Sequence, residues 1–429
     1  MVRERWFRLL LVIVIANIVF HGCGKKPPED TRPQVTVAFW GSPEEKDIIT
    51  SSLDEWQQAN PGIKIRFEHA PADGYVQKML TRIAGGAAPD ILCIRVDHFI
   101  NFASKNVLLN LTPYIENDET FDIKKYFHEV VESFSANGNV YALPRDTAPY
   151  ACVFYNKDVF DQKGVAYPTD DWTWDEMLEK AQALTGEDER GRMHYGYYGW
   201  AWENFVYGNG GNLVDDVKHP TQCMLDTDDA IEGLQFYADL INKYNVMPTP
   251  IALANTGMGV DMMFADGNIA MFQSGIWETP ALLTYDYLNW DVVMFPKSSK
   301  GIRRFGTGGS AYGILASCKH PDLAWEVLKG LSGPVGQTEL ARRGLAQPAI
   351  REIAEGEAWA RNDLPPTNKA MLNEAVKYVV YDPFHVKWIE ARAKYIIPEL
   401  ELLFNGKQDA RTAVSKFIDN VNNMLQEDK

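Results

Sequence analysis

The chain has 429 residues, more than the roughly 250–300 at which a single hydrophobic core stops growing, so we expect two domains or more. Apolar residues make up 46% and charged residues 23%, which excludes a disordered or fibrous protein. Lysine and arginine number 42 against 58 aspartates and glutamates, and the net charge of −16 argues against a nucleic-acid partner.

The first thirty residues are typical of a targeting segment. Three arginines precede an apolar run over residues 9–20, which is too short to span a bilayer but fits the core of a signal peptide. Gly22-Cys23 follows and resembles a bacterial lipoprotein cleavage site, although Phe20 and His21 depart from the usual pattern. We therefore expect a signal peptide over residues 1–22 and an acylated, palmitate-bearing Cys23, with ordinary secretion or an uncleaved anchor as alternatives. The polar, proline-rich residues up to 33 then form a tether.

The body opens with alternating strands and helices. Alternation predicts a strand over 35–40, and the capping box Ser42-Pro43-Glu44-Glu45 predicts a helix that ends at Asn60-Pro61-Gly62. A strand over 63–67, a helix over 75–84 and a strand over 91–96 follow. This order predicts a parallel sheet with helices on both faces, and hence an α/β fold.

In such sheets, ligands bind beyond the carboxyl ends of the strands. Trp40 ends the first strand, and Asp97 follows the third. The topology therefore brings these two side chains to one edge of the sheet. Later segments continue the alternation, with strands expected over 140–144, 151–155, 291–295 and 312–316 and helices over 173–184, 226–244, 321–331 and 410–425.

Cysteine and histidine usage predicts no metal site. Cys93 and Cys152 lie inside apolar runs, no CxxC pair occurs, and the eight histidines are scattered. We expect buried free thiols, and no cofactor.

A set of segments in a fixed order resembles the extracellular solute-binding proteins of ABC sugar importers, the family that includes the maltose-binding protein. The resemblance covers most of residues 34–350 and is looser beyond. Its segments are VTVAFWGSPEE, ANPGIKIRFE, GGAAPD, NGNVYALPRDT, FYNKD, PTDDWTWDEMLEKAQALT, MFADGNIAMFQSGIW and FGTGGSAYGI.

This resemblance implies a two-lobed periplasmic-binding-protein fold (type II, Venus-flytrap) with hinge crossings. One lobe is expected to hold residues 34–146 and 306–344, the other 147–305 and 345–429. A sugar or oligosaccharide would bind in the cleft between them and pass to the transmembrane permease subunits of the importer. The protein would act as a monomer outside the cytoplasm, held to the membrane by its lipid, and would not be an enzyme.

Three candidate ligand residues lie at strand ends. Trp277 follows Ser274-Gly275, where the family places a sugar-stacking aromatic, and Trp40 has a similar place. Asp97 matches a hydroxyl-binding carboxylate, a group that accepts strong hydrogen bonds from neighbouring sugar hydroxyls. The alternatives are core or lobe packing for Trp277, a lid over the sheet for Trp40 and a solvated loop charge for Asp97.

Three more candidates lie at expected crossings between the lobes. Asp146 either binds ligand or pairs with Arg145 as a hinge element. Gly308 and Gly309 either present backbone N–H groups to ligand or permit a turn.

Aromatic residues make up 12% of the chain, and flat ring faces suit sugars. Six rings crowd residues 197–207, and we expect this cluster to line the cleft in part. Trp202 and Glu203 are candidates within it, and Trp388 is a further one after Pro383.

Two other function classes stay open. The same fold would serve a non-sugar solute such as glycerol phosphate, a peptide or a polyamine, and Arg95 and Arg145 leave a phosphate ligand open. A secreted glycoside hydrolase would need two carboxyls placed across one bond, which no short segment enforces.

Overall fold

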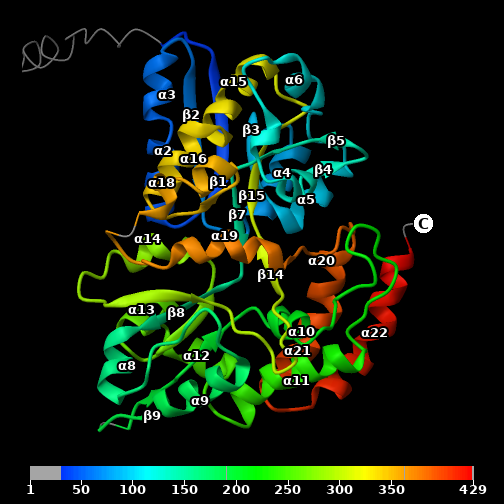
Figure 1. The fold of residues 1–429 in the computed structure, drawn as a ribbon. Helices are drawn as coiled ribbons and strands as arrows, with labels where there is room; N and C mark the ends of the chain where they lie inside the picture. Colours follow the sequence, from blue (N-terminus) through cyan, green and yellow to red (C-terminus); the bar gives the residue numbers. More distant parts are fainter. Residues whose placement is uncertain (1–29, 190, 362, 428–429) are drawn as a thin grey trace, which may run out of the picture.

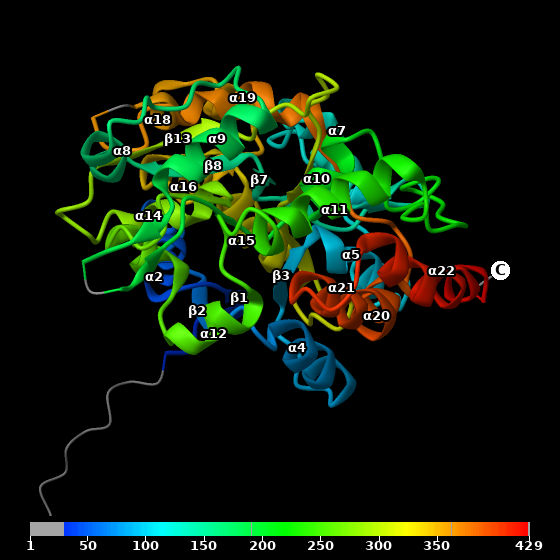
Figure 2. The same ribbon diagram turned by 90° about the horizontal axis from the view of Figure 1, so that it is seen from below.

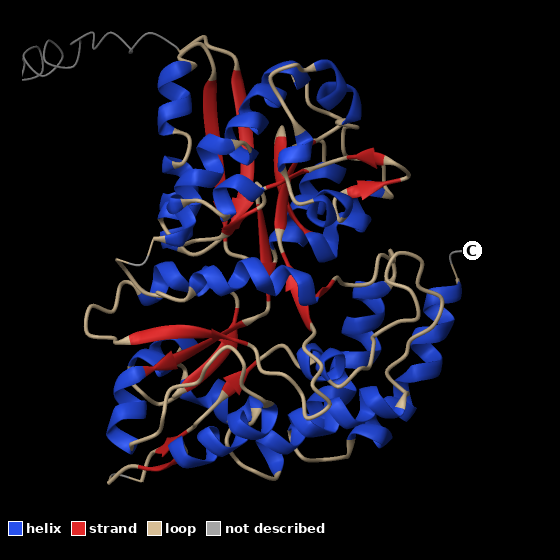
Figure 3. Cartoon of the chain, in the orientation of Figure 1, coloured by secondary structure: helices blue, strands red, loops and turns tan. Residues whose placement is uncertain are grey.

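The computed structural model describes residues 30–427 apart from 190 and 362, and it divides them into an upper and a lower lobe (Figure 1). Each lobe has its own β-sheet with helices packed around it (Figure 3). The expected signal peptide and Cys23 lie outside the described residues. Within the described part of the chain, no helix has both the length and the apolar character needed to cross a bilayer.

The sheet of the first lobe has the strand order β2-β1-β3-β15-β6. β1 runs parallel to β2 and to β3, which confirms the predicted parallel pairing. β15 is antiparallel to both β3 and β6, so a segment from beyond residue 309 completes this lobe. The strands are β1 (Gln34–Trp40), β2 (Lys64–Ala70), β3 (Ile91–Arg95), β6 (Leu143–Pro144) and β15 (Ser310–Ile314).

The expected capping box forms at Ser42, whose hydroxyl accepts from the Glu45 N–H while the Glu45 carboxylate accepts from the Ser42 N–H. The single helix expected from there to Asn60 is wrong, because the chain breaks it at Ser52. The Ser51 and Ser52 hydroxyls donate to carbonyls of the preceding turn and so compete with the helix. The helices here are α2 (Pro43–Ser51), α3 (Asp54–Ala59), α4 (Tyr75–Ala84), α5 (Val96–Ala103), α6 (Thr112–Asn117), α15 (Pro321–Ser332) and α16 (Pro334–Arg342).

The sheet of the second lobe has the order β11-β12-β8-β13, with β8 antiparallel to both neighbours. Phe154 of β8 stacks on Phe272 of β12, with ring centroids 4.6 Å apart, at the centre of a large apolar core. The strands are β8 (Cys152–Asn156), β11 (Tyr198–Gly199), β12 (Met271–Ser274) and β13 (Trp290–Met294).

The C-terminal helices belong to this second core. α21 and α22 pack on each other and on α11, and the three lie on one side of the molecule when it is seen from below (Figure 2). The helices are α8 (Lys157–Lys163), α9 (Trp174–Leu184), α10 (Glu203–Gly208), α11 (Asp228–Asn242), α12 (Pro250–Thr256), α13 (Val260–Ala265), α14 (Thr279–Leu282), α20 (Trp388–Ala391), α21 (Ile397–Phe404) and α22 (Ala410–Gln426), with a π-helical turn over Arg392–Ile396.

Four short strands join the lobes in the order β16-β7-β14-β17. β7 (Asp146–Pro149) leads from β6 to β8, and β14 (Phe305–Gly308) leads from β13 to β15. These two pair antiparallel, and β16 (Gln347–Pro348) and β17 (Val379–Val380) flank them. The lobes are therefore connected by a narrow ribbon, and the space beside that ribbon lies between two separate cores.

Candidate functional site

A cavity of about 390 Å³ lies between the lobes, against the connecting ribbon. It draws on the first lobe, on the second lobe and on the crossings. Its lining residues are Trp40, Glu45, Ala72, Arg95, Arg145, Asp146, Thr147, Ala148, Tyr150, Trp200, Ile276, Trp277, Gly308, Gly309, Ser310, Leu345 and Ala346. We call this cavity the aromatic cleft.

Three rings form one wall of the aromatic cleft. Tyr150 lies 4.8 Å from Trp200 and 6.1 Å from Trp277, centroid to centroid, and the two tryptophans are 6.5 Å apart. Trp200 is 36% exposed, so this wall is not sealed inside the protein. Tyr150 contacts both tryptophans edge-to-face, and the two tryptophans are tilted against each other, so the three rings hold one another in place.

Local chemistry fixes the two tryptophans. A Cβ on Gly275 would lie 1.8 Å from the Trp277 ring, so only glycine lets that ring lie against the backbone. The Trp277 Nε1–H donates to Glu278 at 3.1 Å, and the Trp200 Nε1–H donates to the Ser274 hydroxyl at 3.3 Å. The two indole N–H groups are thus engaged at the edge, which leaves the ring faces for a ligand.

The first lobe supplies the opposite wall. Trp40 ends β1 and packs its ring edge-on against Tyr75 at 5.2 Å. Glu45 also lines the cavity, and burial raises the pKa of its carboxyl. Arg95 ends β3 and lies where β3 meets α5.

The crossings close the floor of the cleft. Asp146, 2% exposed, accepts hydrogen bonds from the Ser310 N–H at 2.8 Å and hydroxyl at 2.9 Å, and from Arg145 Nε at 2.5 Å. Its carboxylate thus ties one crossing to the other, which fits the hinge alternative. Gly309 has φ of +131°, a backbone that favours glycine. A Cβ on Gly308 would come within 3.2 Å of the Tyr150 ring.

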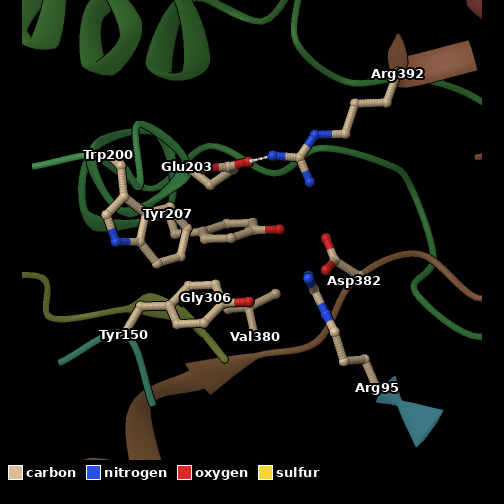
Figure 4. Close-up of a pocket in the computed structure, with 9 residues that line it drawn as sticks. All are labelled: Arg95, Tyr150, Trp200, Glu203, Tyr207, Gly306, Val380, Asp382 and Arg392. Atoms are coloured by element: carbon tan, nitrogen blue, oxygen red, sulfur yellow. Dashed lines mark hydrogen bonds and ion pairs between the residues drawn. The ribbon is translucent and has the colours of Figure 1, made fainter. Parts of the chain in front are cut away.

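A second cavity of about 70 Å³ adjoins the aromatic cleft and shares Arg95, Tyr150 and Trp200 with it (Figure 4). We call it the charged pocket. Its remaining lining residues are Glu203, Tyr207, Gly306, Val380, Asp382 and Arg392.

Two arginines and two carboxyls line the charged pocket, and Asp97 lies beside it. Arg95 donates to Asp97 at 2.6 and 3.0 Å, and Arg392 donates to Glu203. Asp382 lies between the two arginines (Figure 4), and burial raises its pKa to about 7. Glu203 and Asp382 beside it contribute to a raised pKa for Arg392.

The structure brings five of the proposed ligand residues together around the aromatic cleft: Trp40, Asp146, Trp277, Gly308 and Gly309. Glu203 lines the charged pocket instead, and Asp97 lies beside it, bound to Arg95. Trp202 is 4% and Trp388 2% exposed, and both belong to the core of the second lobe. Their large rings are used to fill that core, so the structure does not bring them to the cleft.

Several lining residues were not singled out from the sequence. Trp200 and Tyr207 fall in the aromatic cluster expected to line the cleft in part, whereas Tyr150, Asp382 and Arg392 had no local signal. Among the residues that the structure describes, no group of metal-binding side chains gathers.

Comparison with known proteins gives the chain a context. Residues 41–338 match the family model described as bacterial extracellular solute-binding protein. An arabinooligosaccharide-binding protein of Bacillus subtilis is 24% identical over 373 residues, covering 84% of this chain and 82% of its own length. A maltotriose-binding protein of Pyrococcus abyssi is 25% identical over 391 residues, covering 83% and 80%.

Solved structures show the same fold. An ABC substrate-binding protein of Listeria monocytogenes in complex with cycloalternan superposes with a TM-score of 0.83 at 25% identity, covering 92% of this chain and 99% of its own. A maltose-bound MalE3 of T. maritima gives a TM-score of 0.77 at 20% identity, with the same coverage of 92% and 99%. The two-lobed fold expected from the sequence is thereby confirmed.

Proposed function

The chain belongs to the bacterial extracellular solute-binding proteins, and from that premise we propose that it is the lipid-anchored substrate-binding component of an ABC importer. Its ligand is a sugar or oligosaccharide, captured in the aromatic cleft and delivered intact to the permease. Relatives named for binding arabinooligosaccharide and maltotriose support this ligand class.

One observation carries the proposal: three rings of one wall, Tyr150, Trp200 and Trp277, face a cavity that Trp40 lines from the other lobe. The C–H faces of a sugar ring pack on such surfaces, while polar groups at the edge take the hydroxyls. A volume of about 390 Å³ suits a small saccharide.

The same proposal divides the chain into residues 34–146 with 306–344 and residues 147–305 with 345–429. Closure of the lobes requires that the ligand binds better to the closed form than to the open one. Residues from both lobes and from the crossings line the aromatic cleft, so a saccharide bound there would contact both lobes.

Calorimetry and solution scattering test the proposal together. The mature protein is titrated with arabino-, malto- and manno-oligosaccharides, and the same samples are measured by small-angle scattering. We expect heat of binding and a smaller radius of gyration with at least one saccharide, in a monomer, and chromatography should recover that saccharide unbroken. If no saccharide binds, or if the saccharide is cleaved, the proposal is wrong.

The anchor is tested separately at Cys23. A relative from Streptomyces antibioticus, 25% identical over 392 residues, is described as a lipoprotein, which supports acylation here. Cys23→Ser should move the protein from the membrane fraction to the soluble fraction, and metabolic labelling with palmitate should disappear. A variant that stays labelled and membrane-bound would refute acylation at this residue.

A further inference from the structure

Two tryptophans of the aromatic cleft are held at their indole N–H groups by one carboxylate. Glu278 Oε1 accepts a hydrogen bond from Trp277 Nε1 at 3.1 Å and another from the Ser274 hydroxyl at 2.8 Å. The same hydroxyl oxygen accepts from Trp200 Nε1 at 3.3 Å. The lining of the aromatic cleft includes both tryptophans but neither of the two side chains that join them.

The chemistry of these groups fixes the direction of each hydrogen bond. An indole N–H only donates, and an ionised carboxylate only accepts. Ser274 has one hydroxyl proton, so it donates that proton to Glu278 and its oxygen accepts from Trp200. Burial raises the pKa of Glu278, while the hydrogen bonds from Ser274 and Trp277 favour its charged form. Removal of this carboxylate would release one indole directly and leave the serine that holds the other without its acceptor.

The end of β12 brings the two tryptophans together. β11 pairs parallel with β12 as far as Gln273, so Trp200, the residue after β11, lies beside Ser274, the last residue of β12. The buried Gln273 side chain accepts from the Ala201 N–H at 3.2 Å and donates to the Tyr150 carbonyl at 3.0 Å. The backbone next to two rings of the wall is therefore fixed by the glutamine, and the orientation of the indoles depends on the serine and the carboxylate.

The orientation of the two indoles matters because neither ring is fully enclosed by protein. Trp200 is exposed and Trp277 is partly exposed, so packing alone leaves each ring some rotamer freedom. A hydrogen bond at the indole edge removes that freedom before a ligand arrives. Rings that are already oriented cost less entropy on binding than rings that the ligand must order.

We propose that Glu278 is a positioning residue of the saccharide site, which orients Trp277 directly and Trp200 through Ser274 without contacting the ligand. This inference rests on the proposed function. It assigns one ring to the serine and both rings to the carboxylate, so variants of the two residues should differ in a defined way.

The indole N–H signals of the ligand-free protein test the hydrogen bonds by themselves. They are recorded by NMR on ¹⁵N-labelled protein, and Trp200→Phe and Trp277→Phe assign the two signals. Glu278→Ala should shift both signals, and Ser274→Ala should shift that of Trp200 alone. Glu278→Gln keeps an acceptor oxygen, so both signals should stay near those of the parent.

Calorimetry tests the consequence for binding, with the tightest binder among arabino-, malto- and manno-oligosaccharides as the probe. The dissociation constant should rise about tenfold in Glu278→Ala and about threefold in Ser274→Ala, and Glu278→Gln should stay within about twofold of the parent. Asp266→Ala is the matched control, because Asp266 accepts from the hydroxyl of the exposed Tyr287 outside both cavities. It should change neither the affinity nor the two indole signals.

Three results would overturn the proposal: unshifted indole signals in Glu278→Ala, unchanged affinity in that variant, or weaker binding in Glu278→Gln with unshifted signals. The last result would show that the carboxylate contacts the saccharide itself. If Glu278→Ala does not fold, Ser274→Ala decides, because an unshifted Trp200 signal or unchanged affinity there contradicts the proposal equally. Indole shifts as expected in a protein that binds no saccharide would instead remove the proposed function, so the two failures are distinguishable.

Discussion

The two cavities at the lobe interface are built from different groups. The aromatic cleft, about 390 Å³ in volume, is lined by the rings of Trp40, Trp200 and Trp277. The charged pocket, about 70 Å³, is bounded by two arginines and two acids, and one of its ion pairs, Arg392 with Glu203, is largely buried. Both adjoin the same crossings between the lobes. They differ in the expected consequence of removing one of their side chains.

The difference lies in what is lost when a side chain is removed. A cleft ring is partly exposed in the free protein, so its loss leaves no buried polar group without a partner. Glu203 in the pocket is paired with Arg392, and its loss leaves that guanidinium without its carboxylate. The comparison therefore predicts that the rings of the cleft contribute mainly to affinity and that the Glu203–Arg392 ion pair contributes mainly to stability.

The largest effect is expected for Glu203→Ala, which leaves the guanidinium of Arg392 without its carboxylate. The free energy of unfolding should fall by about 3 kcal/mol, measured by urea denaturation. The double variant Glu203→Ala/Arg392→Ala is the matched control, because it removes both charges and should lose less than the sum of the single variants. Single-variant stability equal to that of the parent would show that the ion pair is not part of the fold.

An effect of about 2 kcal/mol on affinity is expected for Trp277→Ala, the loss of one large aromatic contact with the sugar. The dissociation constant for a bound oligosaccharide should rise about 30-fold in calorimetry, while the thermal midpoint stays near that of the parent. Tyr287→Ala removes an aromatic side chain that is 63% exposed and lies outside the cleft, and its affinity should not change. Unchanged affinity in a folded Trp277→Ala would exclude this ring from the site.

The fold was predictable where local interactions decide it. The helix expected over 75–84 is α4, Tyr75–Ala84, and the expected capping box forms at Ser42, because caps and periodicity act within a few residues. A second capping box, at Thr173, starts the helix expected over 173–184. Trp40 and Trp277 were proposed from their places at strand ends, with the family resemblance added for Trp277, and both line the aromatic cleft. The helix break at Ser52 was not predicted, because it depends on hydrogen bonds that serine hydroxyls donate to carbonyls of the preceding turn.

Reasoning from local interactions could not predict the charged pocket. Glu203 and Arg392 are 189 residues apart in the chain, and Asp382 reaches them only through the crossing after β17. Trp202 and Trp388 show the converse limit, because a tryptophan beside polar residues looks the same in the sequence whether it lines a cleft or fills a core. Long-range pairing of this kind is a property of the tertiary fold, and no spacing in the sequence encodes it.

The pH dependence of Asp382→Asn sharpens the comparison most. The folded protein raises the pKa of Asp382 from 3.8 to about 7, so between these values the folded state holds a proton that the unfolded state has released. The contribution of Asp382 to stability therefore falls as pH rises from about 4 to about 7. Asparagine does not ionise, so the stability of the variant relative to the parent should rise between pH 4 and pH 8, as measured by thermal or urea denaturation. An advantage that is equal at both pH values would show that the charge of Asp382 is balanced within the pocket, and that the pocket, like the cleft, carries no electrostatic cost of its own.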